Sequence, residues 1–384
     1  MTRALRVAIV SSMLESSFGG PPAVVAAHAK ALCGTHTVRV FGCGADEHAG
    51  ELERNLNAPW RVARTWPGWW MRAPGMRQAI EDWRPDIIHS HDVWLHGLYA
   101  SWCAAKKIGV PIVLTPHGIF TSPWRYSSLH KRIYRKLIFD RMAGDVAAVH
   151  VLNRAEAEGC REAGLPDRAI VIPNGIPSAE FVATDRSTAR RRMLEAYPQL
   201  AGRRVVLYLG RLWSQKGLDI LPSCWAAAKR AGWVLLIVGP DYRGYRSLLE
   251  REIIERGLVE HVLLLDPVSG DAKRNILSGS DIFILPSHGE GFSMSAIEAI
   301  AGGTPCVLTT PCNFPELAKT GGGWECADDQ ASLTRALTKA LTTPSGELYA
   351  MGERARLFGM TNYTVEAVAD QLSSLYERLV GSAR

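Results

Sequence analysis

Two carboxylates, Glu290 and Glu298, stand eight positions apart in a segment that follows a short apolar run. We expect Ser293 to cap a helix there, which places Glu290 in the loop before the helix and Glu298 inside it. Carboxylates in these places accept hydrogen bonds from polyols, and the N–H groups of a helix N-terminus bind anions or hydroxyls. On spacing alone, a surface loop glutamate and a second one on a solvated helix face are the stronger interpretation.

Two cations, Arg211 and Lys216, follow the apolar run 205–209 and precede a helical pattern. Arginine offers a two-pronged fork and lysine a point charge, so the pair suits a diphosphate at the carboxyl end of a strand. The alternative is a turn with two solvated basic side chains.

The first half of the chain adds a glycine pair and a histidine, each after a predicted strand. Gly19 and Gly20 lie between a strand and a helix, where glycine lets the backbone approach a phosphate, although most such pairs are simple turns. His117 lies in the loop after the run 112–115. A lone histidine in a loop is more often structural than catalytic.

Apolar runs that alternate with helical patterns supply the elements that position these residues. Such alternation indicates parallel sheets covered on both faces. The predicted strands are residues 5–10, 38–41, 87–89, 112–115, 146–151, 170–172, 205–209, 234–238, 262–265, 282–285 and 306–308, and the predicted helices include 22–32, 218–230, 248–256 and 365–379. The pattern breaks near residues 173–177, and we place the domain connection there and in the Arg-rich stretch 185–192. We therefore predict two domains, 1–180 and 181–364, and a final helical stretch, 365–384, whose packing the pattern does not define.

Together these segments resemble the signature of the family 4 (group 1) retaining glycosyltransferases, which have the GT-B fold, of the bacterial polysaccharide and glycolipid type. The resemblance runs from Gly19 to about Val307. It is carried by the E-x7-E pair, by AGGTPCV at 301–307, by GRLWSQKG at 210–217, by TPHG at 115–118 and by the glycine pair. It implies an α/β fold of two doubly wound Rossmann-like domains that face a central cleft. Residues 1–180 would form the acceptor side, and 181–364 would bind the nucleotide sugar.

The resemblance also assigns roles to the matching positions. Glu290 would hold the hydroxyls of the donor sugar and Glu298 the nucleotide ribose, while Arg211 and Lys216 would bind the diphosphate. His117 would reach the sugar near the reaction centre. The implied catalytic residues are His117, Arg211, Lys216 and Glu290. The implied donor-binding residues are Gly19, Gly20, Arg211, Lys216, Pro267, Val268, Glu290, Gly291, Phe292, Ser293 and Glu298.

The implied reaction is a retaining, metal-independent transfer of a hexosyl group from a nucleotide sugar to an acceptor hydroxyl. The hydroxyl attacks the face from which the nucleotide departs, and the diphosphate helps to deprotonate it. The donor is a substrate, and no cofactor is expected. Two alternatives stay open: another GT-B enzyme, such as a nucleotide-sugar epimerase or a phosphorylase, and a non-catalytic GT-B binding subunit.

The cluster of His89, His91 and His96 with Asp92 invites comparison with a metal site. His89 and His91 end a strand and share one face, whereas the place of His96 depends on a turn that the pattern does not define. Because the resemblance implies that the protein supplies the cations itself, we predict no metal site. We assign His91 and Trp124 to contact with the acceptor.

Residues 122–142 carry six lysines and arginines and a single acid, Asp140. Leu129, Ile133 and Leu137 recur at intervals of four and form an apolar stripe. Basic residues flank this stripe: Lys131, Arg132, Arg135 and Lys136. An anionic membrane surface attracts a basic amphipathic helix, and the equally weighted alternative is that the stripe packs on its own domain.

Four tryptophans, Trp60, Trp66, Trp69 and Trp70, lie close together in the same predicted domain. Tryptophan favours the headgroup level of a bilayer, but stacking on sugars or burial in a core would serve equally. The two features together favour membrane contact slightly. They suggest a lipid-linked acceptor, such as a polyprenyl-diphosphate saccharide.

The composition excludes several classes of protein. The 384 residues carry a net charge of +6 that one segment accounts for, unlike the broad basic surface of a nucleic-acid-binding protein. The apolar run 7–10 is shorter than the roughly 7–15 residues of a secretory signal, and no run reaches the ~18 residues of a membrane span. The 8 cysteines include no CxxC pair, which indicates reduced thiols. We expect a cytoplasmic protein, peripheral on the inner face of the plasma membrane.

Overall fold

The computed structural model describes residues 3–12, 14, 20–43, 60–62, 70–121, 129–182, 185–228 and 231–382. The chain divides into two compact units. The first comprises Met1–Gly175 and Val365–Arg384, and the second comprises Ile176–Thr364. The division thus lies a few residues before the boundary expected at 180–181, and the C-terminal helical stretch belongs to the first unit.

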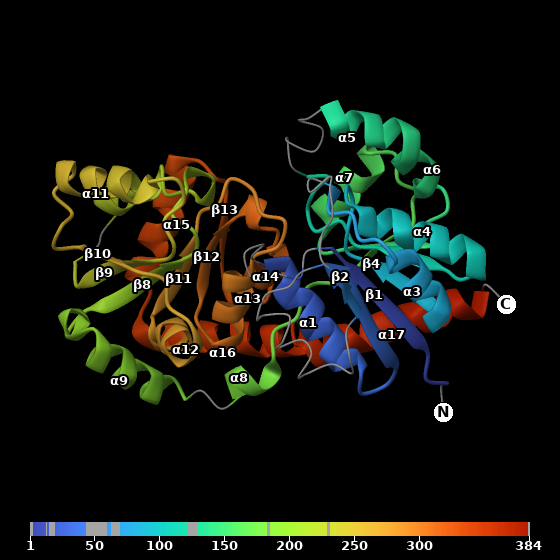
Figure 1. Cartoon of the computed structure of the whole chain (residues 1–384). Helices are drawn as coiled ribbons and strands as arrows, with labels where there is room; N and C mark the ends of the chain where they lie inside the picture. Colours follow the sequence, from blue (N-terminus) through green and yellow to red (C-terminus); the bar gives the residue numbers. More distant parts are fainter. Residues whose placement is uncertain are drawn as a thin grey trace. The chain divides into compact units, whose positions relative to one another are not determined.

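Within the described residues, the first unit has a seven-stranded parallel sheet in the order β3-β2-β1-β4-β5-β6-β7 (Figure 1). Its strands are β1 (Arg6–Ser11), β2 (Thr37–Cys43), β3 (Trp60–Val62), β4 (Ile87–Ser90), β5 (Ile112–Leu114), β6 (Ala148–Val151) and β7 (Ala169–Val171). The chain order reverses between β1 and β4. Open α/β sheets bind ligands at such a reversal, beyond the carboxyl ends of the strands.

Helices cover both faces of this sheet. They are α1 (Gly20–Leu32), α3 (Met76–Trp83), α4 (His96–Ile108), α5 (Leu129–Tyr134), α6 (Asp140–Ala143), α7 (Arg154–Glu162) and α17 (Val365–Ser382), with a π-helical turn (Arg135–Phe139) between α5 and α6. Side chains alternate along a strand, so Val7 and Ile9 of β1 face α1 and α17, while Ala8 and Val10 face the other helices. Each face therefore has its own apolar cluster.

Buried polar contacts tie α17 to the first unit. The hydroxyl of the fully buried Tyr376 lies 2.6 Å from His89 Nδ1. Near the surface, Ser373 Oγ lies 2.7 Å from His36 Nε2. Leu372 of the same helix is completely buried against α1. The last helix of the chain therefore completes the core that contains the first strand.

The second unit has, among its described residues, a six-stranded parallel sheet in the order β10-β9-β8-β11-β12-β13 (Figure 1). The strands are β8 (Arg204–Leu209), β9 (Trp233–Val238), β10 (Val262–Leu265), β11 (Ile282–Leu285), β12 (Cys306–Thr309) and β13 (Gly323–Cys326). The helices are α8 (Ser178–Val182), α9 (Arg186–Ala196), α10 (Leu221–Ala227), α11 (Tyr245–Glu255), α12 (Gly270–Gly279), α13 (Met294–Ala301), α14 (Pro315–Lys319), α15 (Gln330–Thr342) and α16 (Ser345–Asn362). Here the order reverses between β8 and β11.

The predicted fold class, α/β with two doubly wound Rossmann-like domains, is confirmed. Two strands escaped prediction, β3 and β13, because neither is a continuous apolar run: β3 contains Arg61 and β13 contains Glu325. The interpretation of 185–192 as a connection is wrong, because most of this stretch lies in α9. Its Arg190 donates to the carbonyl oxygen of Gly279 at 2.9 Å and to that of Arg203 at 2.6 Å. Arg190 therefore connects α9 to the end of α12 and to the residue that precedes β8.

Buried imidazoles gather in the first unit. His28, His89, His91 and His150 are at most 2% exposed, and the centroids of the His89 and His91 rings are 4.4 Å apart. Desolvation lowers the pKa of every one of these rings, to about 3 for His28 and about 4 for His150. Within the described part of the chain, neither ring nitrogen of His28 has a hydrogen-bond partner.

We predict that His28 makes the first unit sensitive to acid. A ring whose pKa is lower in the folded chain contributes full stability above its unfolded pKa of about 6.5, and this contribution shrinks as the pH falls toward the folded value. His28→Leu removes the titrating ring without removing a hydrogen bond. Relative to wild type, the variant should therefore gain about 2 kcal/mol of unfolding free energy between pH 7 and pH 5.

Denaturant unfolding at both pH values measures this difference, and an unchanged difference would contradict it. Comparison with wild type is needed because other groups titrate in the same range. Burial raises the pKa of Asp92 to about 6 and that of Glu156 to about 7, which stabilises the folded chain as the pH falls. The comparison cancels these opposing contributions.

Candidate active site

An ion pair joins the loops that follow β8 and β11. Lys216 Nζ lies 2.5 Å from Oε1 and 2.7 Å from Oε2 of Glu290, although 74 positions separate the two residues. Ser287 donates its hydroxyl to the same carboxylate at 2.6 Å. The side chains of Lys216 and Glu290 are 19% and 6% exposed, so water screens the pair poorly. The structure thus brings two of the predicted site residues together at the reversal of strand order.

Gly217 permits this approach. It has a φ of +76°, and a Cβ atom at this position would lie 2.0 Å from the carbonyl oxygen of Pro286. The loop after β8 therefore packs against the start of the loop after β11, with no room for a side chain. A backbone hydrogen bond from His288 N to Gln215 O, at 2.9 Å, joins the loops a second time.

Backbone contacts hold the rest of the Glu290 loop. Glu290 N donates to Pro311 O at 3.1 Å, and Asn313 Nδ2 donates to Glu290 O at 3.2 Å. Ser293 caps α13 as predicted, because its hydroxyl accepts from Ala296 N at 3.3 Å. Of the other predicted residues here, Gly291 and Phe292 precede this cap, and the Phe292 ring packs against Phe314 with centroids 5.5 Å apart. The loop is thus fixed at both ends.

Arg211, the other predicted cation, lies in the same β8 loop. Its guanidinium carbon is 5.5 Å from the ring centroid of Tyr242, and its carbonyl oxygen accepts from the hydroxyl of Tyr208 at 2.8 Å. The side chain is exposed, and it forms no ion pair with another described residue. Arg211 therefore adds an exposed positive charge to the loop that also carries Lys216, five positions further along the chain.

Glu298 faces a different cation from the one that holds Glu290. Lys273 of α12 lies 2.7 Å from its carboxylate. Burial raises the pKa of Glu298 in spite of this lysine. The predicted Pro267 and Val268 lie between β10 and α12, where Val268 packs on the core and Pro267 is exposed. Helix α12 thus links Glu298 to the predicted donor-binding residues Pro267 and Val268.

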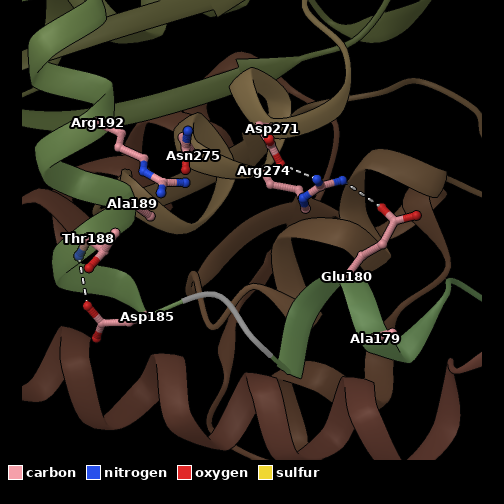
Figure 2. Close-up of a pocket in the computed structure, with 9 residues that line it drawn as sticks. All are labelled: Ala179, Glu180, Asp185, Thr188, Ala189, Arg192, Asp271, Arg274 and Asn275. Carbon is pink, nitrogen blue, oxygen red and sulfur yellow. Dashed lines mark hydrogen bonds and ion pairs between the residues drawn. The ribbon is translucent and has the colours of Figure 1, made fainter.

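A polar cavity of about 450 Å³ lies elsewhere in this unit, between α8, α9 and α12 (Figure 2). Arg274 of α12 pairs there with Glu180 at 3.1 Å and with Asp271. On α9, Thr188 N donates to Asp185 at 2.8 Å. None of the predicted site residues lines this cavity. The predicted site is therefore not this cavity.

In the first unit, two histidines predicted to lie in the site meet each other. His91 follows β4, His117 follows β5, and His91 Nδ1 lies 2.9 Å from His117 Nε2. Their rings stack with centroids 5.1 Å apart. One ring nitrogen must donate and the other must accept. The pair therefore consists of two neutral rings, or of one protonated ring and one neutral ring. Desolvation lowers the pKa of both rings, which favours the neutral pair.

The turn at His117 is strained, and Glu156 holds it. His117 has a φ of +51°, in the left-handed region that residues with a Cβ atom seldom adopt. The buried Glu156 accepts from Gly118 N and, at 2.7 Å, from Leu152 N. Glu156 is not among the residues predicted from the sequence. A signal was present, because Asn153 accepts from Glu156 N at 2.8 Å in a capping arrangement that Asn-x-x-Glu predicts.

A second buried acid closes the reversal between β1 and β4. Asp92 accepts from Ser12 N at 2.9 Å and from the Ser12 hydroxyl at 2.6 Å. Burial raises the pKa of Asp92 to about 6. The predicted glycine pair lies nearby in sequence: Gly20 is the first residue of α1, and Gly19 lies outside the described residues. Trp124 lies outside them too.

Within the described residues, no group of three or more histidine, cysteine, aspartate or glutamate side chains is arranged to hold a metal ion. The ring nitrogens of His89 bond to Tyr376 and Thr115, at 2.6 Å each. His96 instead accepts from Ala73 N at 3.4 Å, and the edge of its ring meets Trp70. Both ring nitrogens of His89 and the Nδ1 of His96 thus form hydrogen bonds within the protein.

The apolar stripe of the basic segment faces outward. Leu129, Ile133 and Leu137 are 70%, 50% and 58% exposed. Tyr134 and Phe139 pack inward instead and are buried. The alternative that the stripe packs on its own domain is therefore wrong. No helix in the described ranges combines the length and apolar character needed to cross a bilayer.

The four predicted membrane cations differ in their surroundings. Arg135 donates to Ala163 O at 3.2 Å and to Asp140 at 3.4 Å, so it is directed to its own unit. Lys131, Arg132 and Lys136 form no ion pair with any other described residue. Trp70 packs against His96 and Tyr134 rather than outward.

We predict that Gly217→Ala destabilises the second unit by more than backbone strain alone. An alanine at positive φ costs about 1–2 kcal/mol, and here its Cβ would also collide with Pro286. Gly232→Ala is the matched control, because Gly232 has the same φ of +76° and, apart from its chain neighbours, no atom of a described residue lies within 4 Å of its would-be Cβ. Denaturant unfolding should show a larger loss for Gly217→Ala. Equal losses would contradict the close packing of the two loops.

Two known domains account for most of this chain. The glycosyl transferase 4-like domain matches residues 19–175, and the glycosyl transferases group 1 domain matches residues 190–358. These ranges fall within the two units of the structure.

Curated relatives agree in kind. The chain is 28% identical over 250 residues to a D-inositol 3-phosphate glycosyltransferase of Actinosynnema mirum, covering 62% of this chain and 58% of that protein. It is 29% identical over 254 residues to a GDP-mannose:cellobiosyl-diphosphopolyprenol alpha-mannosyltransferase of Xanthomonas oryzae, covering 65% and 62%. The chain therefore spans about three fifths of the length of these relatives.

Solved structures share the fold. Anabaena Alr3699/HepE in complex with UDP has a TM-score of 0.80 at 18% identity, covering 98% of this chain and all of that one. WaaG, a glycosyltransferase involved in lipopolysaccharide biosynthesis, has a TM-score of 0.69 at 17% identity, covering 96% and 99%. The chain matches both domains and has the fold of these structures. It therefore belongs to the GT-B glycosyltransferases that combine a 4-like domain with a group 1 domain.

Proposed function

We propose that the protein is a retaining, metal-independent glycosyltransferase that moves a sugar from a nucleoside diphosphate sugar to an acceptor hydroxyl. The observation that carries this proposal is the Lys216–Glu290 pair at the reversal between β8 and β11. The Anabaena protein of the same fold binds UDP, and the Xanthomonas relative is named for GDP-mannose. A nucleoside diphosphate is common to both.

The donor suits the charges of the second unit. Its diphosphate would take the ammonium of Lys216 and the guanidinium of Arg211 as counter-ions. Its sugar hydroxyls would donate to Glu290, which accepts from Lys216 and Ser287 in the structure described here. The ribose would donate to Glu298. One ligand thereby offers acceptors to the cations and donors to the carboxylates.

The chemistry then needs few further groups. The bond between the sugar and the diphosphate breaks, and its electron pair stays on the diphosphate, whose charge Lys216 and Arg211 stabilise. The acceptor hydroxyl forms the new bond on the same face and gives its proton to a diphosphate oxygen. In the first unit, we give His117 the role of contacting the sugar and His91 that of contacting the acceptor.

We further propose a lipid-linked acceptor and contact with an anionic membrane surface through α5 and the π-helical turn. The outward stripe Leu129, Ile133 and Leu137 supports this part, together with three cations that form no ion pair with another described residue. Apolar side chains enter the headgroup boundary while lysine and arginine reach the lipid phosphates. The name of the Xanthomonas relative includes a diphosphopolyprenol acceptor.

Replacing either member of the ion pair should abolish most of the transfer. We expect Glu290→Gln and Lys216→Met to lower kcat about a hundredfold or more, because each removes a group that acts on the reacting donor. The release of UDP or GDP from UDP-glucose or GDP-mannose measures turnover, with and without a polyprenyl-diphosphate saccharide. Glu347→Gln and Lys339→Met are matched controls on α16 and α15 and should retain activity. Full turnover by correctly folded Glu290→Gln would contradict the assignment.

Membrane binding should depend on both parts of the exposed helix. We expect Lys131→Gln, Arg132→Gln and Lys136→Gln together to weaken binding to anionic vesicles by about 3 kcal/mol, at ~1 kcal/mol for each charge. Leu129→Gln with Ile133→Gln should also release the protein, through loss of apolar burial. Leu357→Gln, on an equally exposed leucine of α16, is the control. Vesicle flotation measures binding, and wild-type flotation by the triple variant would contradict this part.

A further inference from the structure

His288 lies between two carboxylates next to the Lys216–Glu290 pair. Its Nδ1 is 3.0 Å from Asp328 Oδ2, and its Nε2 is 3.0 Å from Asp219 Oδ1. The imidazole is 30% exposed, so it is partly removed from water. Glu290 follows His288 by two positions, and Asp219 follows Lys216 by three.

The two contacts define the charge of the ring. An ionised carboxylate only accepts hydrogen bonds, so a ring with a carboxylate at each nitrogen must donate from both. Only the imidazolium form has two N–H groups. Nδ1 contacts Asp328 and Nε2 contacts Asp219. A single metal ion bound to one of these nitrogens would therefore reach only one of the two carboxylates.

The ring joins three loops at the carboxyl ends of the strands. Asp219 lies between β8 and α10, His288 follows β11, and Asp328 lies between β13 and α15. The loop from β8 carries Lys216, and the loop from β11 carries Glu290. The backbone bond from His288 N to Gln215 O connects these two loops independently of the ring. Loss of the ring contacts therefore loosens the loops without parting them.

We propose that His288, as a cation, is a positioning residue that holds the loops of Lys216 and Glu290 in the arrangement that binds the donor. This inference rests on the proposed function, since the donor site is the one assigned above. The histidine touches no reacting atom. It acts through Asp219 and Asp328, which fix the loops on either side of its own.

The surrounding groups favour the cation near neutral pH. Burial opposes the charge, but the hydrogen bonds and charges of Asp328 and Asp219 outweigh it and raise the pKa of His288 above its usual value. Tyr245 of α11 faces Asp219, and burial raises its pKa to about 12. Cys326 lies near Asp328 and has a pKa of about 11, also raised by burial. Neither of these two groups titrates between pH 5 and 9, so the ring changes charge alone among them.

The sign of the pH effect follows from the raised pKa. Below that pKa the ring donates to both carboxylates, and above it only one N–H group is left. Donor affinity should therefore be full at pH 6 and fall as the pH rises through the pKa of His288. We expect the Kd of UDP-glucose or GDP-mannose to rise about tenfold, the size of one charged hydrogen bond. Neither sugar nucleotide has a phosphate group that titrates in this range.

Calorimetric titration of wild type and variants from pH 6 to 9 tests the proposal. His288→Gln should bind with the weak affinity at every pH, and Asp219→Asn with Asp328→Asn should shift the fall in affinity to lower pH. His261→Gln is the control, because His261 immediately precedes β10 and is not part of the contact between His288, Asp219 and Asp328. This variant should follow the wild-type curve. If His288→Gln binds as tightly as wild type at pH 6, or shows the same pH dependence, the proposal is overturned.

A measurement without ligand separates this inference from the proposed function. Amide exchange of residues 214–219 and 286–292, corrected for intrinsic rates, should accelerate in His288→Gln and in wild type above the pKa of the ring. If the wild type binds neither sugar nucleotide at any pH, the proposed function fails, and exchange alone then judges the loop contacts. Unchanged exchange in both segments overturns the role of His288.

Discussion

A charged side chain with little access to water needs a partner of opposite charge. Lys216 and Glu290 are such partners in the second unit, and their contact constrains the loops that carry them. The loops after β8 and β11 have to lie close enough for contact, which only a residue without a side chain at position 217 allows. In the proposed function, Lys216 would pair with the diphosphate of the donor sugar and Glu290 would accept from its hydroxyl groups. In the structure the two residues pair with each other instead. In the proposed function, a nucleoside diphosphate sugar would replace both interactions at once, because it brings anionic oxygens for the ammonium and hydroxyl groups for the carboxylate. An anion that paired with Lys216 alone would leave Glu290 with the hydrogen bond from Ser287 but without its lysine partner.

The first unit meets a similar requirement with a buried acid and a pair of imidazoles. At its own reversal of strand order, Asp92 receives two hydrogen bonds from Ser12, and His91 and His117 share one. Desolvation favours the uncharged forms of these groups. The backbone of His117 lies in the left-handed region, and a carboxylate from α7 holds the turn that follows it. The two units thus present unlike chemistry from the same architecture, one charged and the other made of imidazoles.

The apolar runs predicted the strands well because parallel strands buried on both faces need no alternation. They failed at β13, whose sequence Gly-Trp-Glu-Cys is only partly buried at the sheet edge. The motifs located Lys216 and Glu290, but no pattern within one segment could reveal that His288 meets Asp219 and Asp328, which come from loops 69 and 40 positions away. Nor could spacing decide which side of α5 faces outward. The buried Tyr134 and Phe139 decide that, and they depend on the tertiary packing.

The order in which the elements occur along the chain has a consequence for biosynthesis. Residues 176–364 form an uninterrupted unit, whereas the first unit needs α17, with Tyr376 bonded to His89 and Leu372 inside its core. A ribosome delivers β1 early and α17 more than 350 residues later. The nascent amino-terminal half must therefore wait with a sheet face that α1 covers only in part while the middle of the polypeptide completes its own core. Chaperones that shield apolar surface would have their longest engagement with this waiting half.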